Sequence, residues 1–64
     1  MPNKLIVEFT DEELESLWEL LEDIVPVYED NSNDPNEEED NRELWRKSAR
    51  AGRKLMSAIV LLNS

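Results

Sequence analysis

Acidic and basic side chains are segregated along this 64-residue sequence. All sixteen acidic residues lie between Glu8 and Glu43, and six of the seven basic residues lie between Arg42 and Lys54. Divided after Asn41, the first part has fifteen acids against one lysine, and the second has six bases against one acid. We therefore expect the two parts to attract each other, within one chain or between two copies. The surplus of acid must face solvent or a basic partner.

The length of the chain predicts a single domain over residues 1–64 with a thin core, because a chain of this size buries only about 60% of its unfolded surface. Cysteine and histidine are both absent, so neither disulfides nor a His/Cys zinc site can reinforce the fold. Oligomerisation is the remaining common remedy for a small core. No apolar run reaches the roughly 20 residues that span a bilayer. We expect a cytoplasmic protein with no membrane contact, and a net charge of −9 argues against direct nucleic acid binding.

Leu5, Val7 and Phe9 alternate with Lys4, Ile6 and Glu8, which places the first three on one side of an extended chain. This period of two is typical of a short β-strand. One strand cannot satisfy its own backbone, so we expect it to pair with the same segment of a second copy across a two-fold axis. An extended arm packed on the helices is the alternative.

A helix is predicted over residues 10–25. Thr10 is a good N-cap, and Glu13 three residues later completes a capping box. Apolar residues then recur at helical spacing as far as Val25. Pro26 disfavours helical geometry in the residue before it, so we expect the helix to end there and a loop to span 26–34.

A second helix is predicted to end near Leu62, with two alternatives for its start. Asp34 and Pro35 have the character of an N-cap and a first helical residue, which favours a helix over 35–62. In the other interpretation, 30–41 is a disordered acidic loop and the helix begins at Asp40 or Asn41. Repulsion among the four consecutive acids of 37–40 supports the later start.

The predicted seam of this second helix consists of apolar and small residues with heptad-like spacing, at Trp45, Ser48, Gly52, Leu55, Ile59 and Leu62. The small residues around Gly52 predict that another helix approaches closely there. A helix over 10–25 is too short to cover residues 55–62, so we expect a second copy to cover them. The predicted fold is mainly α, an antiparallel helical hairpin with a short N-terminal strand, assembled as a homodimer in a four-helix-like bundle. The predicted dimer interface consists of Trp45, Gly52, Leu55, Ile59 and Leu62.

The sequence lacks the constituents of an enzyme site. Without histidine or cysteine, its serines have no identifiable base partner, so we expect no catalysis and no cofactor. Residues 30–41 match the first positions of a calcium-binding loop. Pro35 stands where that loop needs glycine, and Asn41 stands where it needs glutamate. We therefore expect no metal site.

The charge pattern predicts two candidate contact surfaces. The first is an acidic surface for a basic protein partner, formed by Glu12, Glu15, Glu19, Glu22, Asp23, Glu37, Glu38, Glu39 and Asp40. Such a row of charges could imitate DNA, which carries one charge per about 1.7 Å of axis. The second is a set of possible anion or ligand contacts at Arg46, Arg50 and Arg53.

The segment from Lys4 to Leu14, followed by the acids up to Glu22, resembles the opening of small acidic proteins encoded by phages and mobile elements. The resemblance implies an accessory or anti-defence protein that binds and inhibits a host factor, with DNA mimicry as one way to do so. Our leading interpretation is a non-enzymatic interaction protein that regulates a basic-surfaced, nucleic-acid-binding protein. One alternative is an oligomer that binds a small ligand or nucleotide through the arginines of the second helix at a subunit interface. Another is a structural dimerisation module.

Overall fold

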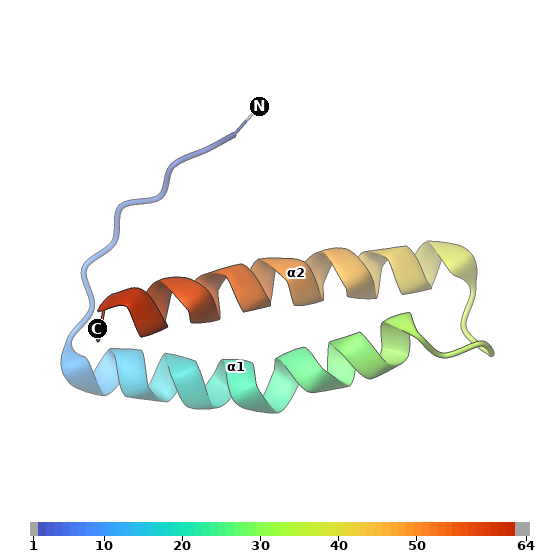
Figure 1. Ribbon diagram of the computed structural model, residues 1–64, viewed down its shortest axis with the longest axis horizontal. Helices are drawn as coiled ribbons and strands as arrows, with labels where there is room; N and C mark the ends of the chain where they lie inside the picture. The colour runs from blue at the N-terminus through green and yellow to red at the C-terminus, as the bar shows by residue number, and fades with distance from the viewer. Residues whose placement is uncertain (1, 63–64) are drawn as a thin grey trace.

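The computed structural model describes residues 2–62 as two antiparallel helices preceded by an extended N-terminal segment (Figure 1). Helix α1 spans Asp11–Ser32, and helix α2 spans Glu39–Leu62. Residues 33–38 join the two helices at one end of the hairpin. The prediction of a mainly helical hairpin is confirmed.

The start of α1 is fixed by the predicted capping box. The hydroxyl of Thr10 accepts a hydrogen bond of 3.1 Å from the backbone N–H of Glu13, and the Glu13 carboxylate accepts one of 2.9 Å from the Thr10 N–H. These two bonds satisfy backbone donors that have no partner inside the helix. The N-terminal boundary of the helix follows from local sequence alone.

The predicted end of this helix is wrong, because α1 continues through Pro26 to Ser32. Proline at this position cannot donate to the carbonyl of Glu22 and normally breaks a helix. The residues that follow nevertheless contact α2. The rings of Tyr28 and Trp45 pack edge to face with their centroids 4.8 Å apart, and Glu29 forms an ion pair with Arg53. Tertiary contacts thus override a local preference. The predicted loop over 26–34 is replaced by a shorter connection.

The connection over residues 33–38 is a polar turn held by its own hydrogen bonds. The Asp34 carboxylate accepts from the backbone N–H of Asn36 at 2.9 Å, which is the hydrogen bond of an Asx turn. The carbonyl of Glu38 then accepts from the Arg42 N–H at 2.9 Å, and α2 begins at Glu39. The predicted helix over 35–62 is therefore wrong, and the later predicted start differs from the observed one by a single residue.

The two helices meet along a narrow apolar seam. Its buried core consists of Val25, Ala49 and Met56, and the half-buried Trp18, Leu21 and Tyr28 pack against it. Because α1 has 22 residues and α2 has 24, the helices are of similar length. The predicted overhang of residues 55–62 is therefore wrong, since it assumed a first helix of about 15 residues.

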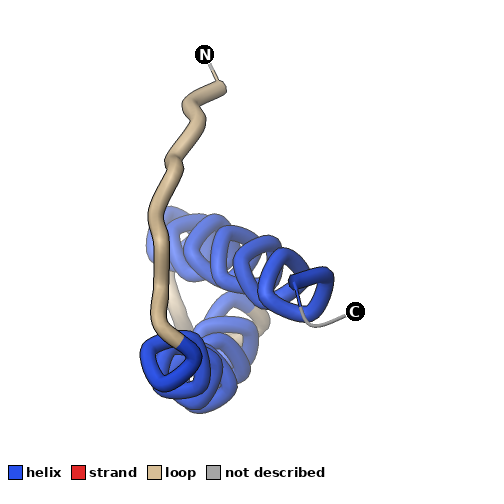
Figure 2. Tube along the Cα trace, turned by 90° about the vertical axis from the view of Figure 1, so that its left-hand side faces the viewer, coloured by secondary structure: helices blue, strands red, loops and turns tan. Residues whose placement is uncertain are grey.

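The N-terminal segment 2–10 forms no strand in the single chain, and each of its residues is exposed. It leaves the start of α1 and ends beyond both helices in both views of the molecule (Figures 1 and 2). The alternative in which this segment packs along the helices is therefore wrong. Pairing of the segment with a second copy stays a prediction.

Candidate functional site

The hairpin has two unlike faces, and both follow from the residues beside the seam. An apolar, exposed residue comes immediately before seam positions on both helices: Ile24 precedes Val25, and Leu55 precedes Met56. One residue corresponds to a rotation of about 100° about a helix axis. Two antiparallel helices in contact are related by an approximate two-fold axis perpendicular to them. Residues that precede seam positions on α1 and on α2 therefore lie on the same side of the hairpin.

We call this side the apolar face. On α1 it carries Leu20, Ile24 and Val27, which are 52%, 40% and 53% exposed. On α2 it carries leucines that are 40–70% exposed, interleaved with small residues. The stripe on α2 reads Leu44, Ser48, Ala51, Leu55, Ala58 and Leu62.

The residues immediately after seam positions are mostly charged and lie on the opposite side. We call this side the charged face, and it comprises Glu19, Glu22, Glu29, Arg46, Arg50 and Arg53. Acids come from α1 and arginines from α2, as the segregation of charge along the sequence requires. The two helices therefore bring an acidic edge and a basic edge next to each other.

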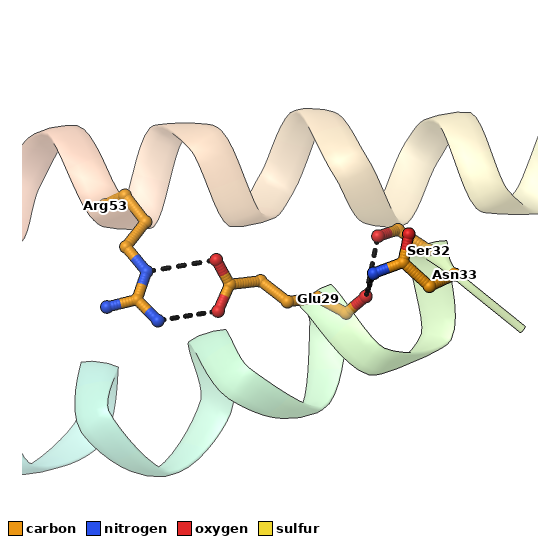
Figure 3. A network of polar contacts seen from close by, with 4 residues as sticks. All are labelled: Glu29, Ser32, Asn33 and Arg53. Carbon is orange, nitrogen blue, oxygen red and sulfur yellow. Dashed lines mark hydrogen bonds and ion pairs between the residues drawn. The ribbon is translucent and has the colours of Figure 1, made fainter.

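One ion pair joins the helices within residues 2–62, between Glu29 and Arg53 (Figure 3). The Arg53 guanidinium donates through Nη2 to Oε1 at 2.6 Å and through Nε to Oε2 at 3.1 Å. Such a bidentate contact suits the planar guanidinium group of arginine. The hydrogen bond from Arg53 is the main cause that lowers the pKa of Glu29; partial desolvation opposes this shift, and the positive charge of Arg53 adds to it. The same hydrogen bond and charge raise the pKa of Arg53.

The backbone carbonyl of Glu29 also accepts hydrogen bonds from neighbouring side chains. The donors are the hydroxyl of Ser32 at 2.7 Å and the side-chain amide of Asn33 at 3.1 Å (Figure 3). These two bonds satisfy a carbonyl in the last turn of α1, where the helix offers few backbone donors. Sequence reasoning did not place these three residues beside Arg53, because it assigned 26–34 to a loop.

An open pocket of about 380 Å³ lies beside this ion pair, lined by Glu29, Ser32, Asn33, Arg46, Ala49, Arg50 and Arg53. The structure thus brings the three predicted arginines together on one wall. Glu29 neutralises Arg53, whereas Arg46 and Arg50 form no ion pair within the described part of the chain. The pocket therefore presents two positive charges that have no acidic partner in the described chain.

The predicted acids of the first helix share one side of α1. Glu12, Glu15, Glu19, Glu22 and Asp23 are all exposed, and their spacing of three or four residues keeps them within one sector of the helix. None of them forms an ion pair with a basic residue in 2–62. The Glu22 carboxylate accepts a hydrogen bond from the indole N–H of Trp18. This row is therefore free to contact another molecule.

The predicted acids of the connection lie apart from this row, around the end of the hairpin. Glu37 is half-buried, and Glu38, Glu39 and Asp40 are exposed. Glu39 forms an ion pair with Arg42 within α2. The predicted acidic surface is therefore two separate clusters.

The predicted dimer interface is divided by the structure. Trp45 packs on Tyr28, Gly52 lies against Val25, and Ile59 is only 4% exposed within one chain. These three positions pack within the single hairpin. A role for them between subunits stays a prediction. Leu55 and Leu62 lie on the apolar face and stay accessible.

Other kinds of site have little support in residues 2–62. No three potential ligands among the described Asp and Glu side chains come together to hold a metal ion. Neither helix has the length and apolar character that crossing a bilayer requires. The fold and surfaces define a two-helix hairpin with one charged and one apolar face. Comparisons with protein-family models, curated proteins and solved structures found no match.

Proposed function

We propose that this chain is a non-enzymatic interaction protein that binds a basic-surfaced protein partner through the acids of α1. The observation that supports this proposal is the row of exposed acids that form no ion pair with the basic residues of the described chain. From Glu12 to Glu22 the row spans about 15 Å, at a rise of 1.5 Å per residue. A rigid helix presents these charges without the entropy cost of ordering a loop on binding.

The partner class follows from the spacing of charge. A groove that binds nucleic acid is lined with Lys and Arg and accepts a row of phosphates. A helix with a carboxylate at every turn offers the same groove a comparable row. We therefore propose that the partner is a nucleic-acid-binding protein and that this chain inhibits or regulates it, in the manner of an anti-defence DNA mimic.

Two charge-neutralising variants test this proposal. The first replaces Glu15, Glu19 and Glu22 with Gln, and the second replaces Glu37, Glu38 and Asp40 with Gln or Asn. Both remove three charges, so they separate a specific acidic row from overall net charge. Affinity capture from extracts of cells that encode the protein should recover a basic partner with wild type and with the second variant, but not with the first. Raising NaCl should release that partner, since exposed charges are screened within about 8 Å at physiological salt. A partner that both variants retain at high salt would contradict the proposal.

We also propose that the chain functions as a homodimer of hairpins in a four-helix-like bundle. The exposed leucines of α2 and the small buried core of the single hairpin support this proposal. The alternating residues of 4–9 would then pair as strands between copies. A molar mass near twice 7.5 kDa in light scattering at micromolar concentration is the expected result.

A second candidate function is binding of a small anionic ligand, such as a nucleotide phosphate. It is favoured by the pocket in which Arg46 and Arg50 stand without acidic partners. Titration calorimetry with ATP should then show binding that is lost when both arginines are replaced by Gln. Equal heats for wild type and variant would remove this candidate. A purely structural dimerisation module would show dimer mass but no partner and no ligand.

A further inference from the structure

The described chain leaves more large hydrophobic side chains exposed than it buries. Four hydrophobic residues in 2–62 are buried, and none is below 2% exposure, whereas twelve large hydrophobic side chains are at least 40% exposed. In proteins, most of the stability of a helix comes from the packing of its apolar side. The thin seam between α1 and α2 provides such packing on one side of each helix only. The apolar face therefore needs a cover.

We propose that a second copy of this chain covers the apolar face, with α1 of each copy packed on α2 of the other. This inference rests on the homodimer proposed above and specifies which surface forms it. The interface consists of Leu20, Ile24, Val27, Leu44, Leu55 and Leu62, with small residues between the leucines of α2.

The opposite net charges of α1 and α2 support a second copy as the partner and also select how the two copies pack. Helix α1 has nine acids and no base, and α2 has six bases and three acids, which gives net charges of −9 and +3. Face-to-face packing about a two-fold axis allows two arrangements. One places α1 on α1 of the partner, and the other places α1 on α2 of the partner. The first brings two helices of charge −9 together at a spacing of about 8–10 Å, whereas the second pairs opposite charges.

The size of the apolar face also suits a dimer. A 22-residue helix is about 33 Å long, and two helices side by side are about 20 Å wide. The face therefore offers on the order of 650 Å² per copy, close to the roughly 800 Å² per partner of a standard stable interface. Its leucines alternate with Ser48, Ala51 and Ala58 at intervals of three and four residues, the pattern of helices that pack side by side.

Two matched single substitutions test the surface. Ala51→Glu places a charge on the apolar face, and Ser57→Glu places the same charge on the opposite side of the same helix, at another exposed position. Sedimentation of the full chain should show a dimer for wild type and for S57E, with the dissociation constant of A51E raised at least about tenfold. A monomeric mass for wild type would overturn both the homodimer and the assignment of this face to it. A dimer that A51E does not weaken would overturn the face and leave the homodimer standing.

Cysteine cross-linking tests the arrangement of helices, because the chain has no cysteine of its own. A mixture of the single variants Val27→Cys and Ala51→Cys should form a disulfide between α1 of one copy and α2 of the other under mild oxidation. The control mixture of Glu22→Cys and Ser57→Cys, on the charged face, should stay uncross-linked. A disulfide dimer of A51C alone, with none to V27C, would show α2 packed on α2 and would overturn the proposed arrangement.

Discussion

Gly52 of α2 lies against Val25 of α1 so closely that a Cβ at residue 52 would be 2.5 Å from Cγ2 of Val25. Real Cβ atoms essentially never approach another heavy atom to this distance, so the contact requires glycine. The φ of Gly52 is not positive, so its backbone does not need glycine for conformational reasons. Gly52 therefore allows the close approach of the two helices because it has no Cβ.

We expect Gly52→Ala to destabilise the hairpin. Alanine improves helix propensity by about 1 kcal/mol. Overpacking a tight contact costs about 1–3 kcal/mol, and the branched Val25 has few rotamers with which to yield. Denaturant unfolding at fixed protein concentration should therefore show a net loss of up to about 2 kcal/mol. Ser57→Ala, at an exposed position on the opposite side of the same helix from the apolar face, should be slightly stabilising. A gain for G52A equal to that of S57A would show that the helices are not in tight contact.

The heptad-like seam predicted from the sequence combines two distinct stripes of α2. Trp45, Gly52 and Ile59 belong to the stripe that faces α1, whereas Ser48, Leu55 and Leu62 belong to the stripe on the apolar face. Both sets repeat every seven residues, so periodicity alone merges them. Only the position of α1, which no local rule specifies, separates inward from outward positions.

The capping box was predictable because its bonds join residues three apart, whereas the path of α1 beyond Pro26 was not. That path depends on Tyr28 and Glu29 meeting residues 17 and 24 positions away on α2. The pocket was missed for the same reason: its α1 wall exists only if 29–32 is helical. The arginine wall was found because Arg46, Arg50 and Arg53 share a face at helical spacing wherever the helix begins.

Pro26 should lower the stability of α1 without preventing the helix from forming. It lies inside α1, and its ring nitrogen cannot donate to the carbonyl of Glu22. Proline within a helix costs about 3 kcal/mol relative to alanine, and part of this is returned because proline restricts the unfolded chain. Pro26→Ala should therefore raise the free energy of unfolding by about 1–3 kcal/mol. Pro35→Ala, in the connection between the helices, should bring no such gain. A loss of stability in P26A would indicate that proline supports a bend that the hairpin needs.

Thr10 should be important for the start of α1. Its hydroxyl and backbone N–H both bond to Glu13. Replacing a threonine N-cap with alanine costs about 1 kcal/mol, while serine keeps the acceptor oxygen. Thermal unfolding followed by circular dichroism should show a lower midpoint for Thr10→Ala and a nearly unchanged one for Thr10→Ser. Equal losses for the two variants would mean that the methyl group, and not the capping bond, matters here.

The ion pair between Glu29 and Arg53 should make stability depend on pH in the acid range. Because the hydrogen bond from Arg53 lowers the pKa of Glu29 in the folded chain, protonation of this carboxyl favours the unfolded state. Its contribution is fully present above the ordinary glutamate pKa of about 4.3 and is lost as the pH falls through the lower folded-state value. Arg53 stays charged throughout this range, and its raised pKa contributes no pH dependence there.

Carboxyl carbon NMR can follow this titration at Glu29 directly. In wild type, the Glu29 pKa should lie below its ordinary value, and Arg53→Gln should return it toward that value by removing the donor. Glu29→Gln and R53Q should each lose part of the pH dependence of unfolding below pH of about 5. The double variant should lose little more than either single one, because both remove the same interaction. An unshifted pKa of Glu29 in wild type would show that the bidentate contact is not held in solution. In that case the ion pair should contribute little to the free energy of unfolding, since exposed pairs that are not fixed in one geometry contribute little.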